Sequence, residues 1–226
     1  MSTFTQRLMD APRHRVIGLA LGGLVMAQVV TGTALAHADG PPSDAIAKVA
    51  SAEAHGEPRS VSKVTAEQVL RLAESQVGIS EDSAGGGTKF QAWYMASPRA
   101  QQTIARDTGK ISDYANAAWC DMFVSWVGEQ LGIQDTMGQD AYTVQHAKWF
   151  EAQGRWGTAP KPGAVVFFDW NGGGIDGIDH VGFVVQDNGD GTIKTVEGNT
   201  GNGVVEIRTR PTYQVAGYGY PSYAAA

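Results

Sequence analysis

The chain has 226 residues, of which 17 are basic and 23 acidic, and its formal net charge is −6. A single cysteine excludes an internal disulfide and a cysteine-rich zinc or iron–sulfur site, and an acidic balance without a basic block argues against nucleic acid as a partner. A hydrophobic content of 42% is sufficient for a folded core, and the length suits one ordinary domain with short additions.

Residues 1–38 have the three-part pattern of a secretory signal peptide. Three arginines precede an apolar stretch at 16–35, which ends in small residues spaced Ala-x-Ala. We predict cleavage after Ala38, so that the chain contacts a membrane only through the leader before cleavage. The alternative is an uncleaved membrane anchor, but glycine, glutamine and threonine within the stretch make it a poor span.

Residues 39–63 are rich in proline, serine, alanine and charged side chains, with few large apolar ones. This composition predicts a flexible linker, although 45–54 is compatible with a short helix. We therefore place one globular domain at 64–226.

Four stretches in the first half of this domain have helical spacing of their apolar residues. The first begins with the capping box Thr65-x-x-Gln68 and ends by Gly78. The others contain Phe90, Trp93 and Tyr94, run from about Trp119 to Leu131, and run from Thr143 to Gly154.

The pattern of the second half of the domain predicts strands separated by turns. Asn188 to Gly191 form a turn between two apolar runs, which predicts a hairpin. Helices followed by antiparallel strands define an α+β domain. The expected strands are 164–169, 181–186, 192–197, 204–209 and 215–220.

Elimination leaves two of the five histidines as candidates for chemistry. His14 and His37 belong to the leader and His55 to the linker. His146 lies mid-helix among polar residues, where we expect it to face solvent. His180 follows a glycine-rich loop at the start of a strand, a place where catalytic groups are often held on a rigid scaffold. A single histidine is more commonly a structural residue, so the neighbours of His180 matter.

The hairpin places a carboxylate and an amide near this imidazole. If Asp187 pairs with Thr192, His180 lies opposite Asn199, and a slip of two residues puts it opposite Glu197. Opposed side chains have Cβ atoms about 5 Å apart, so either residue can reach the ring.

The single cysteine, Cys120, falls in the first turn of the helix expected from Trp119. Unpaired N–H groups and the helix dipole lower the pKa of a thiol at such a position. The alternative is a buried cysteine that acts as a small hydrophobic residue, and the residues alone favour neither interpretation. A thiol, a histidine and a facing carboxylate together match a nucleophile, a base and an orienting group.

Four short segments resemble CHAP domains, the cysteine- and histidine-dependent amidohydrolases/peptidases, and they occur in the order of that family. The resemblance covers roughly 65–220. The sequence departs from the family pattern at Ala164, where aspartate is frequent, and the stretch at 96–118 is long enough to reshape a groove. The segments are Trp119–Trp126, Pro162–Phe168, Asp179–Val185 and Thr195–Asn199.

The resemblance implies a papain-like fold with N-terminal helices packed on an antiparallel sheet, and cleavage of an amide bond in peptidoglycan. The family includes both muramoyl-alanine amidases and peptide endopeptidases. Carried over by position, Cys120 is the nucleophile, His180 the general base and acid, Glu197 the orienter of the imidazole and Asn199 a polar helper. We expect a secreted, monomeric, cell-wall enzyme that acts on peptidoglycan and needs no cofactor.

Two other functions stay open at this point. One is a non-catalytic wall-binding or interaction module on the same fold, and the other is an exported protein joined to a second chain through Cys120. For a hydrolase, the oxyanion would meet the Cys120 backbone N–H and a second donor, for which Tyr114 and Asn116 are candidates. Trp170, beside the loop that leads to His180, is the best candidate for a groove wall.

A metal site is not expected. Asp169-x-Asn171 resembles the start of a calcium loop, but position twelve is His180 rather than the bidentate glutamate that such a loop needs. Glu81 and Asp82 offer oxygen ligands without the alternating acidic spacing of a calcium site.

Overall fold

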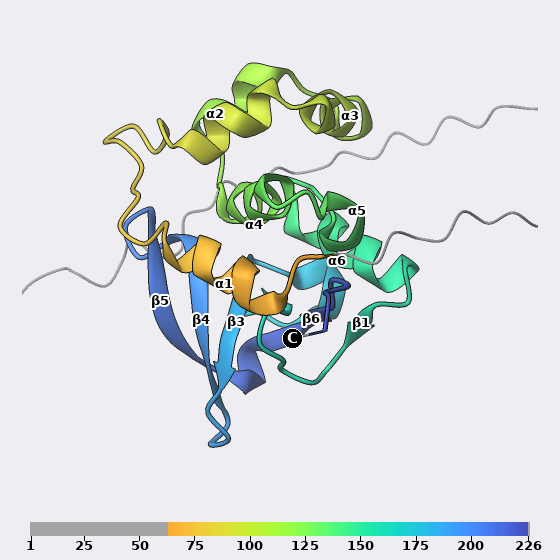
Figure 1. The fold of residues 1–226 in the computed structure, drawn as a ribbon. Helices are drawn as coiled ribbons and strands as arrows, with labels where there is room; N and C mark the ends of the chain where they lie inside the picture. Colours follow the sequence, from red (N-terminus) through yellow and green to blue (C-terminus); the bar gives the residue numbers. More distant parts are fainter. Residues whose placement is uncertain (1–62, 226) are drawn as a thin grey trace, which may run out of the picture. The chain divides into compact units, whose positions relative to one another are not determined.

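A computed structural model describes residues 63–225. The predicted signal peptide and nearly all of the predicted linker lie outside the described residues. In the described part, helices cover one face of a six-stranded antiparallel sheet (Figure 1). The predicted α+β class, with N-terminal helices packed on an antiparallel sheet, is confirmed. Between residues 63 and 225 every helix is too short or too polar to cross a membrane.

The first two helices begin at capping boxes. Helix α1 (Ala66–Glu74) starts at the predicted box of Thr65, and α2 (Lys89–Ala96) starts at a second box in which Thr88 and Gln91 cap each other. Reciprocal capping satisfies backbone N–H groups that have no partner inside the helix. Both starts are therefore fixed by local sequence.

The stretch at 96–118, for which no element is predicted, folds as helix α3 (Pro98–Asp107) and the 3₁₀ helix η1 (Ile111–Asn116). Ser97 caps α3 and Pro98 occupies its first turn. Only Ala100 and Thr103 of α3 are buried, so the helix has no continuous apolar stripe that its sequence pattern could reveal.

Helix α4 (Cys120–Gln130) is the central helix. It lies between the α2–α3 pair and the sheet (Figure 1), and eight of its 11 residues are buried. The short α5 (Gln134–Met137) follows, and then α6 (Thr143–Ala152), where a helix is predicted. A helix buried on nearly all sides has little freedom to shift, which fixes the position of its N-terminus.

All strands of the sheet pair antiparallel, in the order β1-β6-β2-β3-β4-β5. The last strand thus lies between the first two, and η3 (Thr212–Gln214) leads into it. A further 3₁₀ turn, η2 (Gly174–Gly177), interrupts the loop before β3. The strands are β1 (Trp156–Gly157), β2 (Val165–Phe168), β3 (His180–Asp187), β4 (Thr192–Thr200), β5 (Val204–Pro211) and β6 (Val215–Gly219).

The two faces of the sheet carry separate apolar clusters. Phe167 and Val181 belong to the main core under the helices, whereas Phe168 belongs to a smaller cluster on the opposite face. Side chains alternate between faces along a strand, and Phe168 pairs with His180. His180 therefore starts β3 with its side chain on the smaller-cluster face, while Val181 beside it faces α4.

A buried carboxylate ties α3 and the turn before α6 to the central helix. Asp140 accepts hydrogen bonds from Arg99 at 2.9 Å and from Arg106 at 2.7 and 3.0 Å, and its backbone exchanges two bonds with Ser125 of α4. Burial alone would raise the pKa of Asp140, but the hydrogen bonds and charge of Arg106 outweigh burial and lower it. The unpredicted helix α3 thus supplies the two cations that neutralise this carboxylate.

We expect Asp140→Asn to lower the free energy of unfolding by about 2–3 kcal/mol, because it removes the charge partner of Arg99 and the buried one of the two charge partners of Arg106. Asp107→Asn is the matched control. Asp107 pairs with the same Arg106 but is 40% exposed, so its loss should cost less than about 1 kcal/mol. Urea unfolding of both variants measures the difference. Equal losses of unfolding free energy would show that Asp140 does not hold α3 to the central helix.

Candidate active site

Cys120 is the first residue of α4 and is 5% exposed. The backbone N–H groups of Asp121 and Val181 act on its sulfur. Val181 follows His180 in β3, so the start of the central helix abuts the start of the strand that carries the histidine. The fold thereby brings together two segments that are 60 residues apart in sequence.

The structure corrects the expectation that the helix N-terminus lowers the pKa of the thiol. Burial raises the pKa of Cys120 to about 12, and the negative charge of Asp121 adds to this effect. The backbone N–H groups act in the opposite direction but do not outweigh the loss of solvent around the thiolate. In the resting protein Cys120 is therefore a protonated thiol.

His180 and Glu197 meet in a buried hydrogen bond. Nε2 of His180 lies 2.9 Å from Oε2 of Glu197, and the two residues are 4% and 0% exposed. Glu197 occupies β4, and one bond therefore joins the two strands at the level of the thiol. With Nε2 directed at Glu197, the other ring nitrogen, Nδ1, is the one that can exchange a proton elsewhere.

The predicted hairpin register is right at Phe183, whose partner is Val196. A bulge between Val184 and Gln186 shifts the end of the hairpin by one residue, so that Asp187 pairs with Ile193 rather than with Thr192. The sequence of the turn does not predict this bulge.

A glycine lets Glu197 reach the histidine. One residue beyond the Phe183 pair, Gly182 lies opposite Glu197, and a Cβ atom on Gly182 would stand 2.7 Å from Cγ of Glu197. His180 is the next residue of β3 on the same face as Gly182. The carboxylate therefore crosses the space above Gly182 to contact its diagonal neighbour.

Asn199, the fourth predicted site residue, lies in an irregular part of β4. Its φ is 53°, in the left-handed region, and the pairing with β5 is interrupted between Glu197 and Thr200. Its side chain is half-buried. Of the two candidates facing His180, the structure gives the hydrogen bond to Glu197 and not to Asn199.

Two residues that the sequence analysis did not single out complete the surroundings of Glu197. Thr195 donates to Oε1 at 2.5 Å, and Arg210 of β5 donates through Nε and Nη2 at 2.9 and 2.6 Å. Burial alone would raise the pKa of Glu197, but the hydrogen bonds from His180, Arg210 and Thr195 lower it to about 2. Glu197 is therefore an anion at any physiological pH.

The pairing register of the strands does not predict the contact between Arg210 and Glu197. Its Cα partner across the sheet is Ile193, four residues before Glu197 in β4. Only the long guanidinium side chain and the twist of the sheet bring the two charges together. Arg210 lies one residue beyond the strand predicted at 204–209, and the structure extends this strand, β5, to Pro211.

Trp170 forms an aromatic wall beside the histidine, at the position predicted for a groove wall. It is 45% exposed, and its ring stacks on His180 at 5.5 Å between centroids with an interplanar angle of 25°. Phe168 stacks on the same imidazole at 6.0 Å. These rings limit the rotation of His180 and leave an apolar surface open to solvent.

Two aspartates hold the loop between Trp170 and His180. The Asp169 carboxylate accepts backbone N–H groups from three loop residues, two of them glycines, at 2.8–3.3 Å. Asp179 accepts the backbone N–H of Trp170 at 2.9 Å. The acidic pattern that resembles a calcium loop thus caps backbone groups, and nowhere between residues 63 and 225 do three or more metal-ligating side chains gather.

The prediction that His146 faces solvent is wrong. His146 is 1% exposed, with Nδ1 2.6 Å from Oδ1 of Asp121 and Nε2 2.7 Å from the carbonyl of Met137. Burial alone would lower the pKa of His146, but the adjacent Asp121 carboxylate raises it. This pair anchors the first turn of α4 to α6 directly behind Cys120. Polar neighbours along the helix gave no sign of which face packs inward.

Tyr114 and Asn116, the two candidates for a second oxyanion donor, each have a neighbour other than the thiol in the structure. The Tyr114 hydroxyl lies 2.7 Å from Oγ1 of Thr103 on α3. The Asn116 amide packs against Gly86, where an added Cβ would stand 2.2 Å from its Oδ1. The backbone N–H groups that act on the sulfur of Cys120 include those of Asp121 and Val181.

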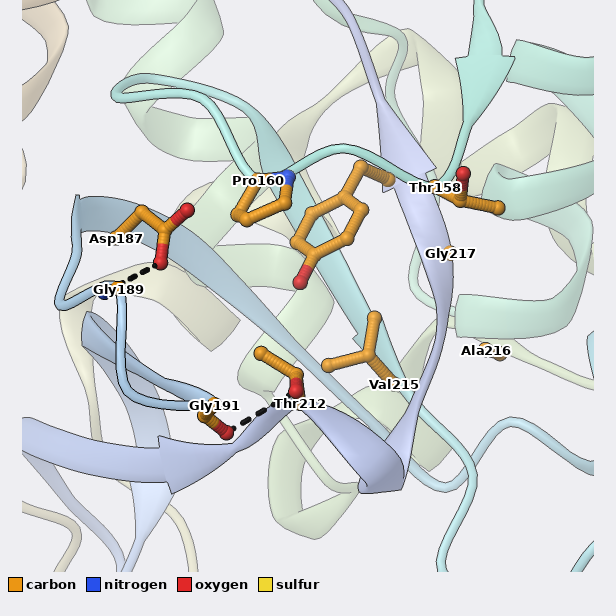
Figure 2. Close-up of a pocket in the computed structure, with 10 residues that line it drawn as sticks. Thr158, Pro160, Asp187, Gly189, Gly191, Thr212, Val215, Ala216 and Gly217 are labelled. Carbon is orange, nitrogen blue, oxygen red and sulfur yellow. Dashed lines mark hydrogen bonds between the residues drawn. The ribbon is translucent and has the colours of Figure 1, made fainter.

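A separate pocket of about 520 Å³ lies beside β6, between the turn after β3 and the segment before β2 (Figure 2). Its lining includes Thr158, Asp187, Thr212, Val215 and Tyr218. None of the lining residues is Cys120, His180 or Glu197, so this pocket is not the candidate active site.

The CHAP domain family matches residues 112–199 of this chain. The matched segment contains Cys120, His180, Glu197 and Asn199, and it confirms the resemblance predicted from the sequence. Residues 112–199 of the chain are therefore similar to CHAP domains.

No protein with a curated description matches the chain. Among solved structures, it is similar to the P60 domain of the antigen MAP1204 from M. avium subspecies paratuberculosis, with 16% identity and a TM-score of 0.40 over 71% of this chain and 96% of that one. It is also similar to the crystal structure of Ly7917, with 17% identity and a TM-score of 0.40 over 70% of this chain and 63% of that one.

The buried thiol should resist alkylation. At pH 8 a thiol with a pKa of about 12 has far less thiolate than free cysteine, so we expect iodoacetamide to modify folded Cys120 at least about a hundredfold more slowly than free cysteine. The chain has no other cysteine, so any cysteine alkylation that mass spectrometry detects is at Cys120. Unfolding in urea should restore the ordinary rate. A folded protein that reacts faster than free cysteine would show an activated thiolate instead.

Gly182→Ala should displace Glu197 and lower the free energy of unfolding by about 1–3 kcal/mol, because the new methyl group meets both Cγ of Glu197 and the Val196 carbonyl within 3 Å. Gly109→Ala is the control, since its added Cβ meets only an Asp113 carboxylate oxygen at 3.3 Å. Urea unfolding compares the two. Equal stability of both variants would mean that Gly182 leaves room for a side chain.

Proposed function

We propose that this protein is a secreted peptidoglycan hydrolase that cleaves an amide bond through a Cys–His–Glu mechanism, as a muramoyl-alanine amidase or a peptide endopeptidase. The observation that carries the proposal is the meeting of three elements within the segment that matches the CHAP domain. The start of α4 brings Cys120 against the start of β3, and β4 supplies Glu197 to the ring of His180.

In the first step, Nδ1 of His180 accepts the Cys120 proton as the sulfur attacks the amide carbonyl carbon. Nε2 keeps its own proton and uses it to donate a hydrogen bond to Glu197. Because burial favours the thiol over the thiolate, proton transfer accompanies attack rather than preceding it. The oxyanion that forms is met by the Cys120 backbone N–H and a second donor.

In the second step, the proton on Nδ1 passes to the leaving nitrogen, the C–N bond breaks, and a thioester joins the acyl group to Cys120. His180 then takes a proton from water, and the resulting hydroxide attacks the thioester carbonyl. The C–S bond breaks, the carboxylic acid leaves, and the thiol regains its proton. Trp170 beside His180 offers an apolar surface for the substrate.

A non-catalytic wall-binding module is the second candidate, and the buried, protonated thiol is the observation that favours it. A binding module, however, does not require an ionised Glu197 that is hydrogen-bonded to His180. The third possibility, a dimer joined through Cys120, is disfavoured by the 5% exposure of that residue.

Cys120→Ala should lower the lysis of purified cell walls by about a thousandfold or more, because the nucleophile is absent from both steps. Val124→Ala is the matched control, since it truncates another buried residue of α4 and should lower stability without abolishing lysis. Turbidity measures lysis, and circular dichroism reports the fold.

Mass spectrometry of the released fragments then identifies the bond. New amino-terminal alanine on the stem peptide indicates an amidase, and other new amino termini indicate an endopeptidase. Lysis that is unchanged in Cys120→Ala would contradict the mechanism. Wild-type protein that binds walls without releasing amine would favour the binding module.

A further inference from the structure

Arg210 makes more hydrogen bonds to Glu197 than any other residue does. Its Nε lies 2.9 and 3.2 Å from the two carboxylate oxygens, and its Nη2 lies 2.6 Å from Oε2. Nη2 also donates to Thr200 at 3.1 Å. A planar guanidinium that grips both oxygens fixes the orientation of the carboxylate as well as its charge.

Aromatic rings hold this guanidinium beside the histidine. Its Cζ lies 5.6 Å from the ring centroid of Phe168 and 5.7 Å from that of Trp170, and both rings also stack on His180. The Arg210 side chain is only 17% exposed. Water therefore screens little of its charge from Glu197.

The other charges near this group are few. Glu206 of β5 acts on Arg210 and is itself paired with Arg208 at 2.8 Å. From α4, Asp121 interacts with the charge of His180, and Asp121 is paired with His146. Both outer carboxylates have partners, and Asp179, which precedes His180, accepts the backbone N–H of Trp170 at 2.9 Å. Glu197, paired with Arg210, is the carboxylate that contacts the imidazole directly.

The pair of Glu197 and Arg210 carries no net charge. An unpaired Glu197 anion 2.9 Å from the ring would stabilise the imidazolium and keep a proton on both ring nitrogens. An imidazolium cannot accept the proton of a thiol. Arg210 cancels the charge of Glu197 but leaves a lone pair directed at Nε2, so the carboxylate orients the ring in the way that a neutral amide would.

We infer that Arg210 is a positioning residue, which acts through Glu197. It offsets the charge of the carboxylate and fixes its orientation, so that Nε2 of His180 stays directed at Glu197 and Nδ1 stays free to accept a proton. The inference rests on the proposed function, in which Nδ1 accepts the Cys120 proton.

The direct test follows the protonation of His180 by NMR in the full chain carrying Cys120→Ala, so that no thiol titrates beside it. Adding Arg210→Met should move the midpoint of the His180 titration to higher pH by about one to two units, because Glu197 then faces the ring with its full charge. Arg208→Met is the matched control. It removes a cation two residues away on the same strand that pairs with Glu206 rather than with Glu197, and it should leave the midpoint in place.

Changing the other member of the pair should have the opposite effect. Glu197→Gln leaves Arg210 as an uncompensated cation, which moves the midpoint to lower pH. The double variant Glu197→Gln with Arg210→Met is neutral again, and its midpoint should return toward that of the parent. Arg210→Lys keeps the charge without the bidentate grip, and it should shift the midpoint less than Arg210→Met does, which keeps the test open if the methionine variant does not fold.

Wall lysis provides the second measurement. In Arg210→Met the acid limb of the pH–rate profile should move upward with the titration of His180, whereas a merely structural role would lower activity equally at every pH. An unmoved His180 midpoint in Arg210→Met, or equal shifts in Arg210→Met and Arg208→Met, would overturn the inference. The NMR titration needs no substrate, so it stands even if walls are not cleaved and the proposed function fails.

Discussion

Glu197 is a carboxylate without solvent exposure, and the arrangement of three strands depends on how its charge is met. Leaving water is costly for an anion unless hydrogen bonds replace those it loses. The replacements come from His180 on β3, Thr195 on β4 and Arg210 on β5, so one side chain sets the relative positions of three neighbouring strands. Gly182 is the residue that makes the contact sterically possible.

The same constraint recurs on the other side of the thiol. Asp121 is paired with His146 inside the core, and Asp140 is paired with two arginines of α3. Each of these buried carboxylates thus has a basic partner, and the charge of Asp121 disfavours a thiolate at Cys120. Burial favours the thiol form of Cys120, so in the proposed mechanism proton transfer from sulfur to nitrogen accompanies attack on the substrate.

Two buried elements hold the residues of the candidate site in these positions. Helix α4 is enclosed by the α2–α3 pair on one side and the sheet on the other (Figure 1), so that the start of the helix cannot drift from β3. The Asp140 turn adds a second attachment through Ser125. The site is open to solvent at Trp170, which stacks on His180.

Local signals in the sequence determined the elements of this protein: the capping box at Thr65, the helix that begins at Cys120, and strands whose hairpin register is right at Phe183. They also singled out the thiol, the histidine and the carboxylate. Only the tertiary structure decided that the thiol is protonated, that His146 is buried, and that Arg210 reaches Glu197 from a position opposite Ile193. The physical reason is that periodicity and caps act between residues close in sequence, whereas the cost of burying a charge is set by whatever distant segments pack around it.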